Sequence, residues 1–205
     1  SSGARDAGNL AWKLADVIDG APAGLLDSYE SERRPHVAAM QRLATSMGRA
    51  VQATRPRQIT IRDTVLGAFD GSPLQRWAVA NVKPLPTCAV GAFATRPARL
   101  PYRRTTGTLF PQSDRLDDRL GGGWAAVSID DVATSLLSEA GLPVVDPGAD
   151  RSWLEARGLT WAILRPDRFV FGCGAAPQVE AAVAAWRALS APPLPARPLC
   201  TPVPA

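Results

Sequence analysis

The stretch that decides the fold class runs from Trp124 to Val145 and reads WAAVSIDDVATSLLSEAGLPVV. Its opening residues, Trp124–Ile129, form an apolar run that predicts a strand, and Leu142–Val145 predicts a second one. Between the two runs, Asp131–Ala140 has the apolar spacing of a helix. A strand, a helix and another strand in this order predict an α/β fold.

The elements expected after this stretch complete a small domain. Ser152–Arg157 predicts a helical turn, and Pro177–Leu189 predicts a closing helix. Between them, Leu159–Leu164 and Arg168–Gly172 are expected to pair as a hairpin. The connecting residues Arg165-Pro166-Asp167-Arg168 suit a turn, because proline is favoured at its second position.

This element order is that of a thioredoxin-like fold, so we predict such a domain over residues 114–190. The redox chemistry of that fold needs two adjacent thiols, one of which has a lowered pKa at a helix N-terminus. The three cysteines, Cys88, Cys173 and Cys200, form no CxxC motif. Cys173 is therefore expected to be a small buried residue, and disulfide oxidoreductase activity is excluded.

The N-terminal part of the chain is predicted to be helical. Apolar residues follow helical spacing on one expected buried face, formed by Ala7, Leu10, Ala11, Leu14, Ala15 and Ile18. Gly20 and Pro22 are expected to end this helix, and a second helix follows through Leu25 and Tyr29. Pro35 is expected to end or kink that helix and to begin a third one. Weaker patterns predict helices over Gln58–Phe69 and Pro73–Val82.

These patterns divide the chain into four parts. We expect a helical segment at 1–83, a proline-rich extended linker at 84–113, the thioredoxin-like domain at 114–190 and a proline-rich tail at 191–205.

Composition excludes several classes of protein. The 205 residues are 46% hydrophobic and 20% charged, and no apolar run approaches the ~20 residues that span a bilayer. The net charge of +4 comes from arginines interleaved with acids, which argues against a nucleic-acid-binding face. A single histidine, His36, leaves little for a metal site or a catalytic triad. Unpaired cysteines and the lack of a leader-like segment predict a cytoplasmic protein.

One short stretch has part of a nucleotide-binding pattern. Gly172-Cys173-Gly174-Ala175-Ala176-Pro177 follows a predicted strand and precedes a predicted helix. Proline stands where the third glycine is needed, and no complete βαβ unit follows. A plain strand-to-helix turn is the better interpretation. The run Gly121-Gly122-Gly123 lacks a following Lys-Ser/Thr and is no P-loop.

Two segments near the N-terminus carry a resemblance to a known family. They are SGARDAGNLAWKLA at residues 2–15 and LLDSYESERRPH at residues 25–36. They resemble the FAD-dependent aromatic hydroxylases, the class A flavoprotein monooxygenases that include para-hydroxybenzoate and phenol hydroxylases. The Glu-Arg-Arg-Pro-His run is most similar to 3-(3-hydroxyphenyl)propionate hydroxylases. The stretch GTLFPQ at residues 107–112 looks like that family's entry into its C-terminal domain.

The resemblance implies hydroxylation of a phenolic or other aromatic substrate with FAD as cofactor and NAD(P)H as co-substrate. It implies that the first helix points its N-terminus at the pyrimidine edge of the flavin. Ser1, Ser2 and Gly3 are then cofactor-binding residues, because small residues let the backbone approach the ring. No catalytic residue and no metal ligand are predicted, and Arg33, Arg34 and His36 are expected to form a packed, salt-bridged corner.

The sequence departs from the family in one respect, because it contains neither the opening dinucleotide-binding unit nor the Gly-Asp motif. We therefore expect the C-terminal portion of such an enzyme, inactive by itself, with no nucleic-acid or membrane partner. The apolar face of the first helix is expected to dock on an N-terminal FAD domain or on a second copy. The alternative from another class is a non-catalytic thioredoxin-like interaction or dimerisation module with a helical arm.

Overall fold

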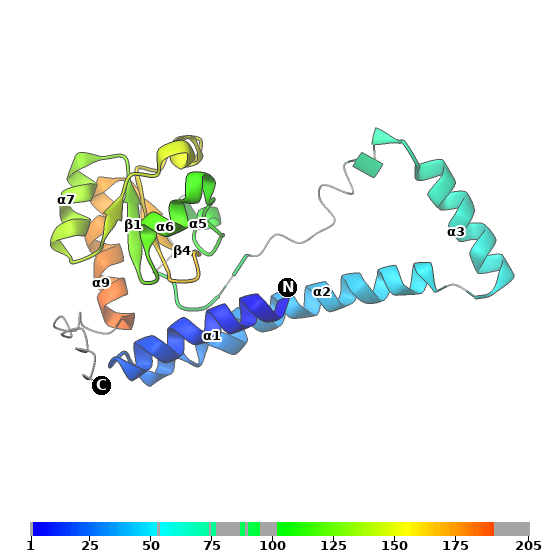
Figure 1. Ribbon diagram of the computed structural model, residues 1–205, viewed down its shortest axis with the longest axis horizontal. Coiled ribbons are helices and arrows are strands. Elements are labelled where there is room, and N and C mark those ends of the chain that lie inside the picture. The colour runs from blue at the N-terminus through cyan, green and yellow to red at the C-terminus, as the bar shows by residue number, and fades with distance from the viewer. Residues whose placement is uncertain are drawn as a thin grey trace, which may run out of the picture. The chain divides into compact units, whose positions relative to one another are not determined.

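The computed structural model describes residues 2–52, 54–73, 75–76, 87–88, 90–94 and 102–190. The chain divides into two compact units (Figure 1). One unit contains Ser1–Glu32 and Cys88–Ala205, and the other contains Arg33–Thr87. The first unit contains an α/β lobe, which we define as residues 102–190.

A four-stranded mixed sheet forms the centre of the α/β lobe, in the order β2-β1-β3-β4. β1 pairs with β2 in parallel and with β3 antiparallel, and β3 pairs with β4 antiparallel. The helix α7 (Asp131–Glu139) connects the two parallel strands, as a parallel pair requires. The strands are β1 (Ala125–Ser128), β2 (Val144–Val145), β3 (Trp161–Leu164) and β4 (Val170–Gly174).

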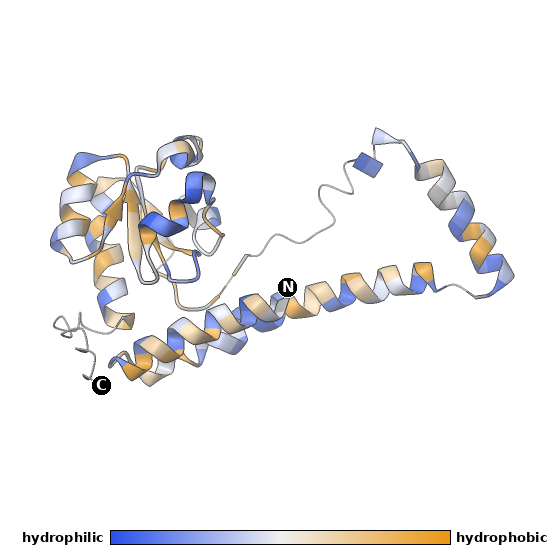
Figure 2. Cartoon of the chain, in the orientation of Figure 1, coloured by the Kyte–Doolittle hydropathy of each residue, from blue (hydrophilic) through white to orange (hydrophobic). Residues whose placement is uncertain are grey.

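Helices cover both faces of this sheet, which is why three of its strands are buried on both sides. On one face, α7 and α9 (Val179–Leu189) enclose a core that includes Trp161, Ile163 and Phe171. On the other face, Phe110 and Leu154 pack over Val127 and its neighbours. The helices α6 (Leu116–Leu120) and α8 (Arg151–Glu155) lie over that second core. Figure 2 shows the apolar strands in the middle of the lobe. The expectation of a mixed α/β fold is confirmed.

A segment of the predicted linker covers the outer edge of β4. Gly107 N–H donates to the Val170 carbonyl (2.8 Å), and Val170 N–H donates to the Thr108 carbonyl (2.9 Å). Leu109 forms an isolated bridge with Phe169. The neighbouring short elements are α5 (Tyr102–Thr105) and the 3₁₀ turns Ser113–Arg115, Gly148–Asp150 and Ala176–Gln178. The domain boundaries at residues 83, 113 and 190 stay predictions, and residues 191–205 lie outside the described part of the chain.

The expected hairpin and the strand-to-helix turn are both present. The turn at residues 165–168 connects β3 to β4, and Arg168 there has a positive φ of 66°. Gly172 and Gly174 lie in β4, and a Cβ added at Gly172 would lie 3.1 Å from the Ala94 Cβ. Close packing therefore explains these two glycines, and the interpretation of the stretch as a plain turn is supported.

The helices before the lobe differ from the expectation at Pro35. They are α1 (Ser2–Ile18), a 3₁₀ turn (Ala23–Leu25), α2 (Ser28–Val51) and α3 (Pro56–Phe69). The prediction that Pro35 separates two helices is wrong, because α2 passes through it. Proline removes the hydrogen bond to the carbonyl four residues earlier and its ring crowds that carbonyl, but buried Glu32, Arg33 and His36 flank it and hold the helix on both sides. Of the predicted helix over Pro73–Val82, residues 74 and 77–82 lie outside the described residues.

The face that α1 buries is also different from the predicted one. Leu14 and Ile18 are 42% and 82% exposed, whereas Asn9, Trp12 and Lys13 are buried. Trp12 packs in a small apolar cluster with Ala21, Leu25 and Ala92. α1 thus buries a mixed polar and aromatic face and leaves most of its apolar face open.

Candidate functional site

The N-terminal end of α1 is the site that the sequence predicts for the cofactor. Ser1 lies outside the described residues, α1 begins at Ser2, and Gly3 is exposed with no atom within 4 Å of an added Cβ. The first turn contains no acidic residue. The first N–H groups of a helix have no partner within it, and they carry the positive end of its dipole. Such an end can accept a flat anionic edge, and the assignment of Ser1, Ser2 and Gly3 to the flavin stays a prediction.

A second site, absent from the sequence-based expectations, lies where α1 meets the α/β lobe. Five side chains form it, and we call it the buried charge cluster: Asn9 and Lys13 of α1, Glu32 of α2, and Arg165 and Asp167 of the turn between β3 and β4. Asn9, Lys13, Glu32 and Arg165 are at most 2% exposed. The cluster contains two cations and two carboxylates, so its formal charge is zero.

Glu32 is the centre of this cluster. Its carboxylate accepts hydrogen bonds from Arg165 Nη1 (2.9 Å), Arg165 Nη2 (2.8 Å) and Asn9 Nδ2 (2.8 Å). The Ala92 backbone N–H donates to the same group at 2.8 Å, and the Lys13 ammonium lies 3.1 Å from its Oε2. One carboxylate therefore joins α1, α2, the loop at Ala92 and the β3–β4 turn.

Arg165 uses the planar fork of its guanidinium in two directions. Besides the pair with Glu32, its Nε and Nη2 donate to Asp167 at 2.9 Å and 2.6 Å. Asn9 Nδ2 also donates to Asp167 (2.9 Å), which closes the network. The guanidinium carbon lies 5.0 Å from the ring centre of Trp12 and 4.6 Å from that of Phe93. Bidentate pairing and aromatic stacking are both contacts that lysine cannot reproduce.

The charged groups of the cluster shift each other's pKa values. Burial alone would raise the pKa of Glu32 and Asp167, but the charge and hydrogen bonds of Arg165 outweigh it, so both pKa values lie below their ordinary range. Burial would lower the pKa of Arg165, yet Asp167 and Glu32 raise it overall. The pKa of Lys13 is lowered, because burial and Arg165 outweigh its attraction to Glu32. Both carboxylates and Arg165 are thus charged at neutral pH.

The cluster explains the unusual face that α1 buries. Asn9, Trp12 and Lys13 are spaced i, i+3 and i+4, so they lie on one side of the helix. Hydrophobic periodicity cannot detect this face, because lysine and glutamate are almost always exposed unless they are paired. The partners Glu32 and Arg165 are 133 residues apart. Only the exact spacing of Asn9, Trp12 and Lys13 inside the family motif was available as a local indication.

The other residues singled out in the motif differ in their burial. Arg33 and His36 are buried and Arg34 is exposed. Arg168, in the turn after Arg165, pairs with Asp117 and with the Gly121 carbonyl. The burial of Arg33 and His36 agrees with the expected packing, while the salt bridges of this corner stay a prediction.

Cys173 is a buried residue of β4 and forms no disulfide with any described cysteine. Burial raises its pKa to about 11, which a contact with Thr106 only partly offsets. A thiol with a raised pKa is a poor nucleophile at neutral pH, so this position agrees with the expected packing role.

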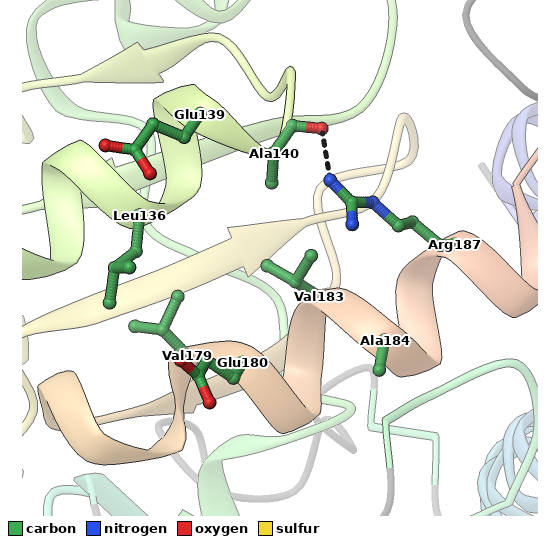
Figure 3. Close-up of a pocket in the computed structure, with 8 residues that line it drawn as sticks. All are labelled: Leu136, Glu139, Ala140, Val179, Glu180, Val183, Ala184 and Arg187. Atoms are coloured by element: carbon green, nitrogen blue, oxygen red, sulfur yellow. Dashed lines mark hydrogen bonds between the residues drawn. The ribbon is translucent and has the colours of Figure 1, made fainter.

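A pocket of about 300 Å³ lies between α7 and α9 (Figure 3). Leu136, Val179 and Val183 line its floor, and Arg187 at its rim donates to the Ala140 carbonyl (3.4 Å). Its charged residues are exposed, and its lining contains no serine, cysteine, histidine or residue of the family motif. It is therefore not the candidate site.

The described residues contain no group of three or more His, Cys, Asp or Glu side chains that could hold a metal ion. None of their helices is both long enough and apolar enough to cross a membrane.

Comparison with known proteins agrees with the resemblance. Residues 2–44, which include α1 and the first part of α2, match the family model of an FAD binding domain. Among individual relatives, the 3-(3-hydroxy-phenyl)propionate/3-hydroxycinnamic acid hydroxylase of Mycolicibacterium gilvum is 38% identical over 151 residues, which are 68% of this chain and 26% of that protein.

A second relative covers more of the chain. The probable NADH-specific resorcinol 4-hydroxylase of Rhodococcus jostii is 32% identical over 228 aligned positions, covering 96% of this chain and 40% of that protein. The chain thus spans 26% to 40% of the length of these two relatives. The match to the FAD binding domain and the hydroxylase relatives together confirm the resemblance, and the chain belongs to the family of FAD-dependent aromatic hydroxylases.

The fold is similar to that of solved flavin enzymes. The anhydrotetracycline hydroxylase OxyS of Streptomyces rimosus matches 94% of this chain and 41% of its own, with a TM-score of 0.63 at 22% identity. The flavin-dependent monooxygenase PieE matches 90% of this chain with a TM-score of 0.55 at 20% identity. At these identities the likeness concerns the fold alone.

Proposed function

We propose that this chain is the C-terminal portion of an FAD- and NAD(P)H-dependent monooxygenase that hydroxylates a phenolic or related aromatic ring. The observation that carries the proposal is the match of residues 2–44 to an FAD binding domain. Relatives named as hydroxylases of hydroxyphenylpropionate and resorcinol support the aromatic substrate. The NADH-specific name of the second relative supports a nicotinamide co-substrate. The alternative, a non-catalytic module, has no such support.

Ser1, Ser2 and Gly3 are the residues that would hold the flavin edge. FAD, when bound, supplies the oxygen-activating chemistry of such enzymes. The role of the chain is to present the open first turn of α1, whose N–H groups and dipole favour negative charge on the ring. Gly3 supports this role, because it is exposed and leaves open space for a close approach.

The α/β lobe is a thioredoxin-like domain without a CxxC motif in this proposal, with boundaries at 114 and 190. Its supporting features are the parallel β1–α7–β2 unit, the antiparallel β3–β4 pair and the closing α9. Buried Cys173, with its raised pKa, supports a role without thiol redox chemistry.

The exposed apolar face of α1 is the surface on which the FAD-binding portion would dock. Leu14 and Ile18 are exposed here, and small residues such as Ala7 and Ala11 continue the face toward the helix N-terminus. Burying one such large side chain contributes about 1.5–3 kcal/mol, so an uncovered face favours association. A second copy of the chain is the competing occupant.

The test is a titration of FAD against this chain, followed by flavin fluorescence. The chain alone should not bind FAD at micromolar concentrations, which require about 8 kcal/mol. A helix terminus contributes only about 0.3–2 kcal/mol, and dinucleotide affinity comes mainly from a Gly-rich turn. Adding the N-terminal segment of the Mycolicibacterium relative should then give saturable binding that depends on this chain.

A Leu14→Asp variant tests the docking surface. It places a charge on the proposed docking face and leaves the first turn of α1 unchanged. It should weaken the reconstituted FAD binding at least tenfold. The proposal fails if the isolated chain binds FAD tightly, or if the added segment binds FAD equally well without this chain.

A further inference from the structure

We propose that the buried charge cluster is a set of positioning residues that holds α1 at one rotation about its axis and one height along it. The inference rests on the proposed function for its consequence, which is the placement of the helix end that faces the flavin. Its residues come from three segments: α1, the first turns of α2 and the β3–β4 turn. The hairpin of the α/β lobe would thus determine where the end of α1 lies.

The geometry admits one placement of the helix. Asn9 and Lys13 are one turn apart on the same side of α1, and both contact Oε2 of Glu32. Each residue of an α-helix advances about 100° and ~1.5 Å. A slip by one residue would therefore turn Asn9 and Lys13 away from Glu32 and leave buried charges without partners.

Such a slip is unfavourable in free energy, because it leaves buried charges unpaired. Removing one partner of a buried ion pair is strongly destabilising, whereas an apolar replacement of the whole set is often neutral. A network of this kind therefore adds little net stability, but it discriminates strongly between alternative placements. The planar fork of Arg165, which contacts Glu32 and Asp167 together, provides this discrimination.

The other side of α1 supplies little restraint in the described part of the chain. Leu14 and Ile18 are exposed, and the further contacts of α1 include those of Val17 in the apolar cluster and those of Trp12 and Asp16 with Trp124. Trp12 meets Trp124 edge-to-face with ring centres 5.4 Å apart, and Trp124 Nε1–H donates to Asp16 (2.8 Å). These aromatic contacts report on how α1 lies against the sheet.

A short helical segment connects the cluster to the N-terminal end of α1. Gly3 lies six residues before Asn9, which is ~9 Å along the axis. A slip of one residue would displace the helix end by ~1.5 Å, and errors of ~1 Å can reduce catalysis ~100-fold. The cluster thus has a consequence at the proposed flavin site without touching it.

The test uses this chain without flavin, in the variants Arg165→Met and Arg165→Lys. Amide hydrogen exchange is followed in α1 and in β3 and β4, together with the near-ultraviolet circular dichroism of the tryptophans. Arg187→Met is the matched control, because Arg187 is an exposed arginine of the same lobe whose hydrogen bond is long at 3.4 Å.

We expect both Arg165 variants to speed exchange in α1 about tenfold and to reduce the tryptophan signal, while the sheet amides change less than threefold. Arg165→Lys keeps the positive charge, so its effect reports on the planar geometry of the guanidinium. If Arg165→Met does not fold, Arg165→Lys still tests the proposal. The control should resemble the parent chain. Unchanged exchange in α1, or equal acceleration in α1 and the sheet, would overturn the proposal.

A second measurement separates this inference from the proposed function. In the complex reconstituted with FAD, Arg165→Lys should shift the reduction potential of the flavin to more negative values, and Arg187→Met should not. If α1 loosens and the potential stays constant, the link to the flavin is overturned. If no FAD complex forms at all, the proposed function fails, while the exchange result still decides the positioning role.

Discussion

Gly91 is the residue at which the packing around Glu32 is tightest. Its φ is +139°, and a Cβ added there would lie 2.2 Å from the Glu32 Cγ. Gly91→Ala therefore combines backbone strain with a clash inside the buried charge cluster. We expect it to lower the free energy of unfolding by about 2–4 kcal/mol, measured by urea denaturation.

Gly122→Ala is the matched comparison for this substitution. Gly122 has no atom within 4 Å of an added Cβ, and its φ is not in the left-handed region. Its effect should stay within about 0.5 kcal/mol. Equal stabilities of the two variants would contradict the close approach of Gly91 to Glu32.

At the scale of elements, Pro35 gives the clearest prediction. Proline at this interior position of α2 leaves the carbonyl of Ser31 without its helical N–H partner. Pro35→Ala restores that donor, so we expect it to raise the free energy of unfolding by about 1–2 kcal/mol, measured by denaturation followed with far-ultraviolet circular dichroism.

Pro56→Ala is the control, because Pro56 is the first residue of α3, where a missing N–H costs nothing. It should leave stability unchanged or lower it slightly. A loss of stability in Pro35→Ala would contradict this expectation.

The elements of the α/β lobe could be predicted from sequence, because their patterns are local. The apolar run at 124–129, the helical spacing at 131–140 and the proline turn before Asp167 each depend on neighbouring residues only. The buried face of α1 could not be predicted in this way. Its burial depends on Arg165, which is far away in the chain, and periodicity instead indicated the face through Leu14 and Ile18.

The same limit applies to the candidate site. The helix end at Ser2 and Gly3 followed from a family resemblance in consecutive residues. The sequence around Glu32 and Arg165 does not indicate that they are partners, because each lies near other charged residues, which are usually exposed. A buried ion pair between distant segments becomes visible only when the fold brings them together.

For the molecule as a whole, the cluster predicts a particular response to acid. The pKa values of Glu32 and Asp167 in the folded state lie below their ordinary values. Their stabilisation is therefore complete above the unfolded pKa values of about 4, and it is lost as the pH falls through the lower folded pKa values. The urea midpoint should be steady from about pH 6 to 8 and fall below about pH 4.

The charged form of Lys13 opposes folding, unlike the charged carboxylates, but stability again rises with pH. The lowered pKa of Lys13 means that the protonated form opposes folding, and this penalty is relieved as the pH rises through the folded pKa.

Comparing Glu32→Gln with Glu155→Gln, a substitution in an exposed pair, tests the acid response. Only the first should make the decline in acid shallower, and an identical decline in both would argue against the cluster as its cause.

The distance along the chain between Glu32 and Arg165 also has a consequence for biosynthesis. A ribosome adds about 5–20 residues per second, so the 133 residues between them take roughly 7 to 27 s to appear. Throughout that interval a nascent Glu32 lacks its partner Arg165, and the side of α1 that bears Asn9, Trp12 and Lys13 is uncovered. We therefore expect the growing chain to depend on chaperones that shield α1 until the last hairpin has been translated.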